Sequence, residues 1–476
     1  MSHATTTDLY EATMALSYLR EGMTRQATFS LFVRDLPRDR GFLVSAGLEP
    51  ILSFLTDFEV TEEDARDFAS ALGRSEQDVR ALVGLRFEGE VRAVPEGRIV
   101  LTGEPLLEVT AALPQAQIVE TWLLSQISHQ TAVASKAARC VLAAAGHPVI
   151  DFSLRRSHGP EAGMQAARVS TMVGFAGTSN VAAALRWETR ASGTMAHSYI
   201  EAFGDEEAAF LAFARSTPGP VTLLVDTYDT FNGVMTAARV LNTLQRGRGC
   251  AVRLDSGDLE ALARQARDIL DRSGLPEVAV IASGGLDEYR IDRLVRADAP
   301  IDVYAVGTKV GTSADAPYLD SAYKLVEYDS MPVMKLSAAK VTAPGRKQIL
   351  RADGLDDVIA LADEAVPDGR ENVLQTVMES GRRVAEPDTL AAAHQRFIKD
   401  LAALPPDACR IKEPKSPLPA TSARLRELTS SVRSHLASDI EQRRAREAGE
   451  QDTSVSHASP AAADPSRPSC GQAERR

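Results

Sequence analysis

The feature that most constrains the fold is an alternation of short apolar strands and amphipathic helices that repeats across residues 149–308. One unit shows the pattern clearly. The strand-like run Ala251–Leu254 is followed by Ser256 and Asp258, either of which can cap a helix, and the next strand-like run is Val278–Ala282. This alternation predicts a parallel sheet covered by helices. Its regular repetition favours an α/β barrel over an open doubly wound sheet, although both folds produce the same local pattern.

Each predicted strand of this region ends beside a residue that is able to bind or transform a ligand. In a parallel α/β barrel the carboxyl ends of the strands meet on one face, where the active site forms. In chain order, the residues at these ends are Arg155 and Arg156, His197, Asp226, Arg253 and Asp255, Ser283 and Gly284, and Gly307 and Thr308. We therefore expect one site that draws on these positions.

The chain has 476 residues, more than one hydrophobic core usually organises, so several parts are expected. We predict an N-terminal α/β domain over residues 1–145 and the barrel over residues 146–322. Further strand-like runs within residues 323–410 are expected to rejoin the N-terminal domain. Residues 411–476 form a C-terminal extension that is predicted to be disordered from about residue 445, where large apolar side chains almost disappear.

Charge and composition exclude several classes of function. The net charge of -12 argues against a nucleic-acid-binding face, which needs an excess of Lys and Arg. The first residues lack the basic start and apolar core of a signal peptide, and no apolar run approaches the roughly 20 residues of a membrane span. The four cysteines show no metal-binding spacing, which fits a reducing compartment. These features predict a cytoplasmic protein without nucleic-acid or membrane partners.

The basic residues at the strand ends have both a structural and a functional interpretation. Arg253 lies inside an apolar run, so it needs a partner; Asp255 is a structural candidate, or both side chains face a ligand. Arg155 and Arg156 either form a solvated strand end or bind a carboxylate or phosphate. His197 has apolar neighbours, and such a histidine is more often structural, but its place at a predicted strand end favours a role in function.

The small-residue loops at residues 174–180, 283–285 and 307–308 are either tight turns or sites where backbone amides bind phosphate. Because the chain has neither a Walker A sequence nor a GxGxxG sequence, P-loop and Rossmann sites are disfavoured. A hydrated Mg²⁺ held mainly by substrate phosphates is compatible with the nearby carboxylates, which are Asp226, Asp229, Asp255 and Asp258. The residues alone thus predict a barrel enzyme for a phosphorylated, anionic small molecule.

Seven motifs occur along the chain in this order: Thr7–Tyr10, Asp151–Gly159, Gly177–Asn180, Ser192–Ser198, Arg253–Asp258, Gly311–Ser313 and Tyr323–Val326. In sequence and in order they resemble the motifs of nicotinate phosphoribosyltransferases. The resemblance extends from about Thr7 to Arg351. It implies a type II phosphoribosyltransferase, with an α/β N-terminal domain that C-terminal strands rejoin and an irregular parallel α/β barrel. One departure is Gly285, where the family often has Asp or Asn.

The resemblance implies an ATP-dependent, ligase-type enzyme of the salvage route of NAD biosynthesis. Such an enzyme forms nicotinate mononucleotide from nicotinate and phosphoribosyl pyrophosphate, with Mg²⁺ and ATP hydrolysis. The implied catalytic residues are the phosphohistidine His197 and Asp255, beside the ribose hydroxyls. The implied nicotinate-binding residues are Tyr10, Phe152, Arg155, Thr194 and Arg253, and those for phosphoribosyl pyrophosphate are Ser283, Gly284, Gly307 and Thr308.

The family's counterpart of Tyr10 comes from the partner subunit, so a homodimer with shared sites is also implied. Two rival functions remain. One is a related phosphoribosyltransferase for nicotinamide or quinolinate, and the quinolinate enzymes do not use a phosphohistidine. The other is a catalytically inactive barrel that acts as a ligand sensor or assembly partner, against which the set of His197, Arg253, Asp255 and Thr308 argues.

Overall fold

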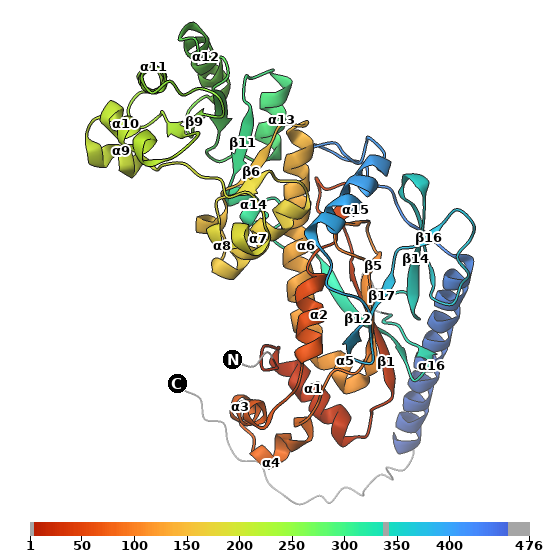
Figure 1. The fold of residues 1–476 in the computed structure, drawn as a ribbon. Helices are drawn as coiled ribbons and strands as arrows, with labels where there is room; N and C mark the ends of the chain where they lie inside the picture. The colour runs from red at the N-terminus through yellow and green to blue at the C-terminus, as the bar shows by residue number, and fades with distance from the viewer. Residues whose placement is uncertain (1–3, 337–341, 456–476) are drawn as a thin grey trace, which may run out of the picture.

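Two large sheets organise the molecule. A computed structural model describes residues 4–336 and 342–455. Figure 1 shows a parallel sheet in one half of the molecule and an antiparallel sheet in the other, with the long helix α6 (Glu120–Ala143) running between them. More than half of the α6 residues are buried, so the helix gives both halves of the molecule a common packing surface.

The parallel sheet has six strands in the order β7-β6-β11-β10-β9-β8. All neighbouring pairs in it are parallel, as the strand–helix alternation predicts. The strands are β6 (Val149–Asp151), β7 (Gly177–Thr178), β8 (Thr222–Leu224), β9 (Ala251–Leu254), β10 (Ala279–Ala282) and β11 (Val303–Val306). They curl into part of a barrel, which confirms the irregular α/β barrel.

The segment before His197 connects the two edge strands of this sheet without forming a strand of its own. On the side of β7, Thr178 N donates to Arg190 O at 3.0 Å. On the side of β8, the Thr194 hydroxyl donates to Thr222 O at 2.6 Å. The prediction of a strand ending at His197 is therefore wrong, because side-chain bonding replaces a backbone ladder beyond Ala191.

Helices follow most of the parallel strands and begin at short polar caps. Asp258 caps α12 through its own side chain, so Asp258 and not Ser256 fills this role. Asp229 and Asp287 cap their helices in the same way. The helices are α7 (Pro160–Met172), α8 (Val181–Arg186), α9 (His197–Phe203), α10 (Glu206–Ser216), α11 (Thr230–Thr243), α12 (Leu259–Arg272), α13 (Glu288–Arg296) and α14 (Thr308–Gly311).

The antiparallel sheet combines N-terminal and C-terminal strands in the order β13-β12-β1-β5-β3-β17-β18. Strand β12 pairs with β1 over the length of both, so the chain after the barrel rejoins the N-terminal half as predicted. The strands are β1 (Gln26–Val33), β3 (Glu90–Ala93), β5 (Pro105–Ala112), β12 (Ser321–Tyr328), β13 (Met331–Pro332), β17 (Gln375–Glu379) and β18 (Arg382–Arg383).

Smaller elements complete this half. A four-stranded sheet has the order β16-β14-β15-β19, and β2 pairs with β4. Their bounds are β2 (Leu43–Val44), β4 (Ile99–Val100), β14 (Lys347–Ala352), β15 (Asp356–Leu361), β16 (Glu371–Asn372) and β19 (Ala420–Thr421). The remaining α-helices are α1 (Leu9–Arg20), α2 (Leu48–Asp57), α3 (Glu62–Leu72), α4 (Glu76–Val79), α5 (Leu113–Ile118), α15 (Leu390–Ala403) and α16 (Ala423–Val455).

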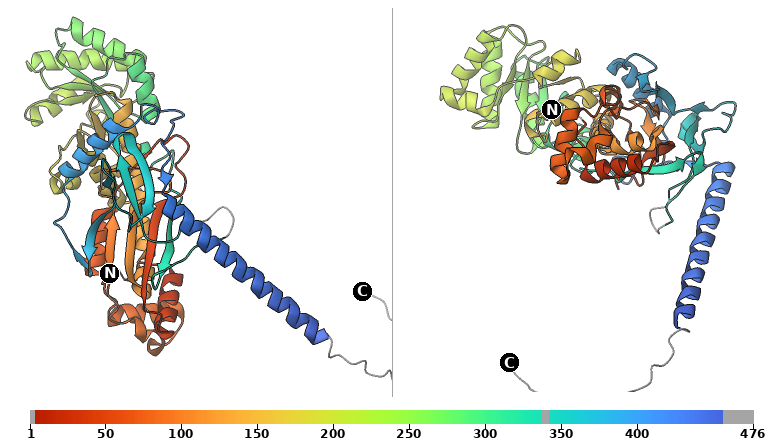
Figure 2. Two further views of the ribbon diagram at one scale, coloured as in Figure 1. Left: turned by 90° about the vertical axis from the view of Figure 1, so that its right-hand side faces the viewer. Right: turned by 90° about the horizontal axis from the view of Figure 1, so that it is seen from below.

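Helix α16 projects away from the rest of the molecule, as Figure 2 shows. It continues to Val455, past the point near residue 445 where composition predicts the start of a disordered tail. Glu, Arg and Ala are good helix formers, which accounts for the extension. The rest of that predicted tail, residues 456–476, lies outside the described residues. No described helix combines the length and apolar character that crossing a membrane requires.

Candidate active site

Arg253 lies at the centre of the candidate site. Its Nε donates to Ser283 Oγ at 2.8 Å, and its Nη2 donates to Asp255 Oδ1 at 2.6 Å. The guanidinium carbon lies 5.4 Å from the centre of the Phe152 ring, a cation–π contact. The side chain is 8% exposed, yet Nη1 donates to no described residue. A guanidinium that is held on two nitrogens and free on the third is arranged to pair with a carboxylate ligand.

Asp255 joins Arg253 to the neighbouring strand ends. Its Oδ1 also accepts a hydrogen bond from Ser283 Oγ at 2.5 Å. Partial burial works against ionisation, but the Ser283 hydrogen bond and the Arg253 charge outweigh it and lower the pKa of Asp255. Asp255 is therefore a carboxylate at neutral pH and balances the buried charge of Arg253.

Asp226 lies two residues after the end of β8, binds the end of β9 through one carboxylate oxygen and leaves the other oxygen without a partner among the described residues. Its Oδ2 accepts from Asp255 N at 3.0 Å and from Ser256 Oγ at 2.7 Å. Its Oδ1 is buried and has no hydrogen-bond partner among the described residues. Leaving a buried carboxylate oxygen unpaired costs about 1–3 kcal/mol or more. This oxygen is thus suited to a cation or a donor that a ligand brings.

Two of the other carboxylates considered for Mg²⁺, Asp229 and Asp258, cap α11 and α12 with one oxygen each. In the part of the chain that the structure describes, no group of three or more His, Cys, Asp or Glu side chains is arranged to hold a metal ion. Asp226, with Asp255 nearby, fits a Mg²⁺ whose remaining ligands are substrate phosphates and water.

His197 begins α9, and its ring lies between two strand ends. Its Nδ1 is 3.1 Å from Thr227 Oγ1, and its Nε2 is 3.9 Å from Asp255 Oδ2. The side chain is 40% exposed. The Thr227 contact orients the ring from one side and leaves Nε2 accessible from the site. His197 therefore reaches the carboxyl-end face of the sheet from a helix start and not from a strand end.

The turns after β10 and β11 present backbone donors. Gly284 has a φ of +85°, and a Cβ there would lie 1.7 Å from the Asp255 carbonyl oxygen, so only glycine fits. The amides of Gly284, Gly285 and Gly307 donate to no described residue. Thr308 follows at the first position of α14. Free amides in glycine turns are suited to bind the oxygens of a phosphate group.

Three of the nicotinate-binding residues that the family resemblance implies do not contact Arg253 in the structure. Arg155 lies in the short 3₁₀ helix Leu154–Arg156 after β6 and is exposed. The Thr194 hydroxyl is bonded to a β8 carbonyl, so Thr194 holds its segment against the sheet. Tyr10 lies in α1, which Figure 1 shows far from β9. Within one chain, the structure does not bring Tyr10 to Arg253.

Comparison with known proteins decides the family. Residues 5–128 match the family model of the nicotinate phosphoribosyltransferase N-terminal domain, and residues 148–310 match that of the nicotinate phosphoribosyltransferase family. The nicotinate phosphoribosyltransferase pncB2 of Mycobacterium tuberculosis is 44% identical over 408 residues, which are 84% of this chain and 87% of the relative. This chain belongs to the nicotinate phosphoribosyltransferase family.

Two further relatives agree with this assignment. The nicotinate phosphoribosyltransferase of Bacillus subtilis is 40% identical over 76% of this chain and 77% of its own length. The crystal structure of human nicotinic acid phosphoribosyltransferase superposes with a TM-score of 0.79 at 28% identity and covers 90% of this chain and 99% of the human chain. The similarity therefore includes both the N-terminal half and the barrel.

The structure also shows contacts in this site that the sequence did not predict. Ser283, which was expected at phosphoribosyl pyrophosphate, bridges Arg253 and Asp255. Lys309 Nζ pairs with Asp287 Oδ2 at 2.5 Å and so ties α14 to the start of α13. These contacts join residues that are some 20 to 30 positions apart in the sequence, so no local sequence pattern predicts them. The sequence gives one indication that Lys309 belongs to the site, which is its position next to Thr308.

Proposed function

We propose that this chain is a nicotinate phosphoribosyltransferase that forms nicotinate mononucleotide and diphosphate from nicotinate and phosphoribosyl pyrophosphate. The observation that carries the proposal is Arg253, whose Nη1 donates to no described residue, whose guanidinium packs on the Phe152 ring, and whose Nε donates to Ser283, the residue before the Gly284 turn. The fork pairs with the nicotinate carboxylate, and the Phe152 ring packs on the pyridine. Nicotinamide would leave the guanidinium charge without a counter-charge, which favours nicotinate.

The glycine turns and Asp255 place the second substrate. The free amides at Gly284 and Gly307, with Thr308, bind phosphate oxygens of phosphoribosyl pyrophosphate, and the Asp255 carboxylate accepts hydrogen bonds from the ribose hydroxyls. The bond from the ribose C1 to the diphosphate oxygen breaks, and a bond from C1 to the pyridine nitrogen forms. No proton transfer is needed, so the residues act mainly by positioning and by charge stabilisation.

Mg²⁺ and ATP are part of the proposal. When bound, Mg²⁺ neutralises charge on the departing diphosphate, and Asp226 Oδ1 is the protein oxygen available to it. His197 is the acceptor of the ATP γ-phosphoryl group through Nε2, because Thr227 engages Nδ1. ADP leaves, and water later takes the phosphoryl group from the histidine as inorganic phosphate. This cycle couples ATP hydrolysis to nucleotide formation.

Replacing His197 with alanine tests the coupling. We expect ATP to lose its stimulation of nucleotide formation, while slow ATP-independent turnover remains because Arg253 and the glycine turns are intact. The measurement is the initial rate with and without ATP, together with the ADP released for each nucleotide formed. Thr227→Val is the matched variant, since it keeps the ring but removes its Nδ1 contact, and it should weaken coupling only partly. Full ATP stimulation in His197→Ala would contradict the phosphohistidine.

A shared site in a homodimer is also part of the proposal, and it is supported by Tyr10, which is 48% exposed and lies on α1, far from β9 in its own chain. The test mixes two inactive variants, Tyr10→Ala and Arg253→Ala. If Tyr10 serves the partner's barrel, a mixed dimer contains one site with both native residues, and activity returns to a fraction of wild type. If each chain supplies its own Tyr10, both sites of the mixed dimer remain defective and no activity returns.

The activity itself is tested by supplying the purified protein with phosphoribosyl pyrophosphate and Mg²⁺, with either nicotinate or nicotinamide, in the presence and absence of ATP. We expect nicotinate mononucleotide as the product and a strong preference for nicotinate. A preference for nicotinamide moves the chain to a neighbouring activity. Absence of any nucleotide product, with ligand binding retained, supports the inactive sensor instead.

A further inference from the structure

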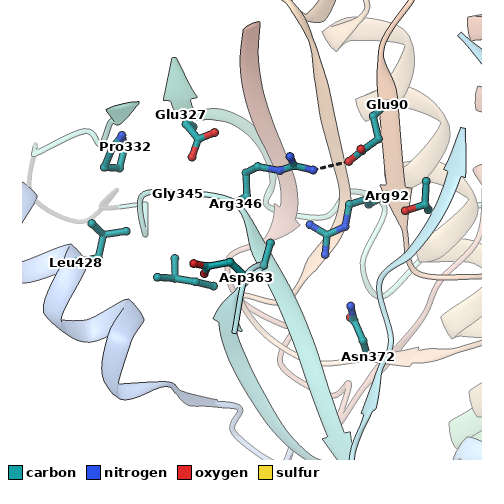
Figure 3. Close-up of a pocket in the computed structure, with 12 residues that line it drawn as sticks. Glu90, Arg92, Glu327, Pro332, Gly345, Arg346, Asp363, Asn372 and Leu428 are labelled. Carbon is teal, nitrogen blue, oxygen red and sulfur yellow. Dashed lines mark hydrogen bonds and ion pairs between the residues drawn. The ribbon is translucent and has the colours of Figure 1, made fainter. Parts of the chain in front are cut away.

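A second cavity lies in the other half of the molecule. It has a volume of about 700 Å³, within the range of small-molecule pockets. Its walls come from β3, β12, β15, β16, β17, the loop before β14 and the first part of α16, as Figure 3 shows. None of the lining residues belongs to the parallel sheet that carries Arg253, so this cavity is separate from the candidate active site.

Two arginines give one end of the cavity a positive charge. Arg92 on β3 has a side chain that is only 10% exposed, and its one partner among the described residues is Glu108, at 3.5 Å. Glu108 is already shared, because it also accepts hydrogen bonds from Ser30 Oγ at 2.6 Å and from Lys347 N at 3.0 Å. One buried carboxylate therefore serves two cations, Arg92 and Lys347. Burial lowers the pKa of Arg92, although Glu108 works against this shift.

Arg346 supplies the second guanidinium. Its Nη2 pairs with Glu90, and its Nε is buried without a hydrogen-bond partner among the described residues. Figure 3 shows the Arg346 and Arg92 side chains pointing into the same space. The two guanidiniums that line this end, Arg92 and Arg346, therefore each pair with one carboxylate, and several of their N–H groups have no acceptor among the described residues. A phosphate group satisfies such donors with charge-assisted hydrogen bonds.

The other end of the cavity has a different chemistry. The Glu327 charge works to raise the pKa of the buried Lys347, but its carboxylate makes no side-chain hydrogen bond with a described residue, so it can accept from hydroxyl or amino groups. The Asp363 carboxylate is taken by Arg424 on α16, at 2.8 Å. Leu361 and Leu428 line the cavity with apolar surface that suits a flat ring.

We propose that this cavity binds a nucleoside monophosphate. The phosphate pairs with Arg92 and Arg346, a ribose hydroxyl or base amino group donates to Glu327, and the base packs against Leu361 and Leu428. The size, the charge at one end and the free acceptor at the other fit this class together, whereas a lone phosphate would leave the apolar part unfilled. This proposal stands on the cavity alone and does not depend on the proposed catalytic activity.

The test is calorimetric titration of the full-length protein with AMP, adenosine and inorganic phosphate. We expect AMP to bind, with adenosine and phosphate each at least about tenfold weaker, because each lacks one half of the recognised group. Arg346→Gln and Arg92→Gln should weaken AMP binding by at least about tenfold. Arg383→Gln is the matched control, since Arg383 is also ion-paired, to Glu49 at 2.8 Å, but lies outside the cavity. It should bind AMP as the wild type does.

Three outcomes would overturn the proposal. They are failure of AMP to bind, phosphate binding as tightly as AMP, and unchanged AMP affinity in Arg346→Gln with its melting temperature preserved. The two arginine variants also separate this cavity from the barrel, because Arg92 and Arg346 line only the cavity. Weaker AMP binding in both variants supports the cavity, and unchanged AMP binding in both assigns AMP to the barrel and refutes the proposal.

Discussion

Arg253→Ala is expected to lower kcat/KM for nicotinate by about 10²- to 10³-fold. The change removes a charge-assisted pair with the substrate carboxylate, worth about 1.5–3 kcal/mol, and also leaves Asp255 without its main counter-charge. Because nicotinamide never gains that pair, its rate should fall less, and the preference for nicotinate should narrow. Steady-state rates with both substrates measure the two effects. Equal losses for nicotinate and nicotinamide would contradict carboxylate recognition by Arg253.

Two variants separate this role from a general loss of structure. Arg253→Lys keeps the charge but not the planar fork, so it should recover only part of the rate. Ser283→Ala leaves the guanidinium in place and removes one of its two supports, so its loss should be smaller, about tenfold. If Ser283→Ala were as damaging as Arg253→Ala, the arginine would act mainly by holding the strand ends together.

The strand-end pattern located this site because parallel strands of one sheet end on the same face. It correctly anticipated that Arg253 and Asp255 leave one strand and Gly284 the next, and the sheet pairs β9 directly with β10. It failed at His197, which belongs to a helix start whose preceding segment bonds mainly through Thr194. The periodicity of apolar residues predicts regular strands. It cannot identify a segment that lies along the sheet edge without a ladder of backbone hydrogen bonds.

Contacts between residues far apart in the chain could not be predicted from the sequence for a different reason. The Ser283 hydroxyl satisfies Arg253 and Asp255 at once, and nothing in the local sequence distinguishes this serine from a turn residue. Asp229 shows the reverse case, since a carboxylate in a suitable region for Mg²⁺ instead caps α11. The role of each polar residue depends on the neighbouring strand, and that is settled only by the fold.

A buried ion network joins the two halves of the molecule close to the Gly284 turn. Glu288, at the start of α13, is fully buried, and its carboxylate lies 2.5 Å from Lys136 Nζ and 3.0 Å from Arg139 Nε, both on α6. Lys136 also forms an ion pair with Asp315 at 2.9 Å, and Asp315 forms a second ion pair with Arg40 of the N-terminal half. The network therefore holds α13 and the segment after α14 against α6, the helix that both halves share.

Glu288→Ala is expected to destabilise the protein by about 3–5 kcal/mol, because it leaves the buried charges of Lys136 and Arg139 without their carboxylate. Urea unfolding followed by circular dichroism measures the change. The matched control is Glu207→Ala, which removes the exposed partner of Arg239 and should cost less than about 1 kcal/mol. A loss in Glu288→Ala as small as in the control would show that water or rearrangement replaces the carboxylate. Since α13 follows the Gly284 turn directly, the same variant should also raise the KM for phosphoribosyl pyrophosphate more than the KM for nicotinate.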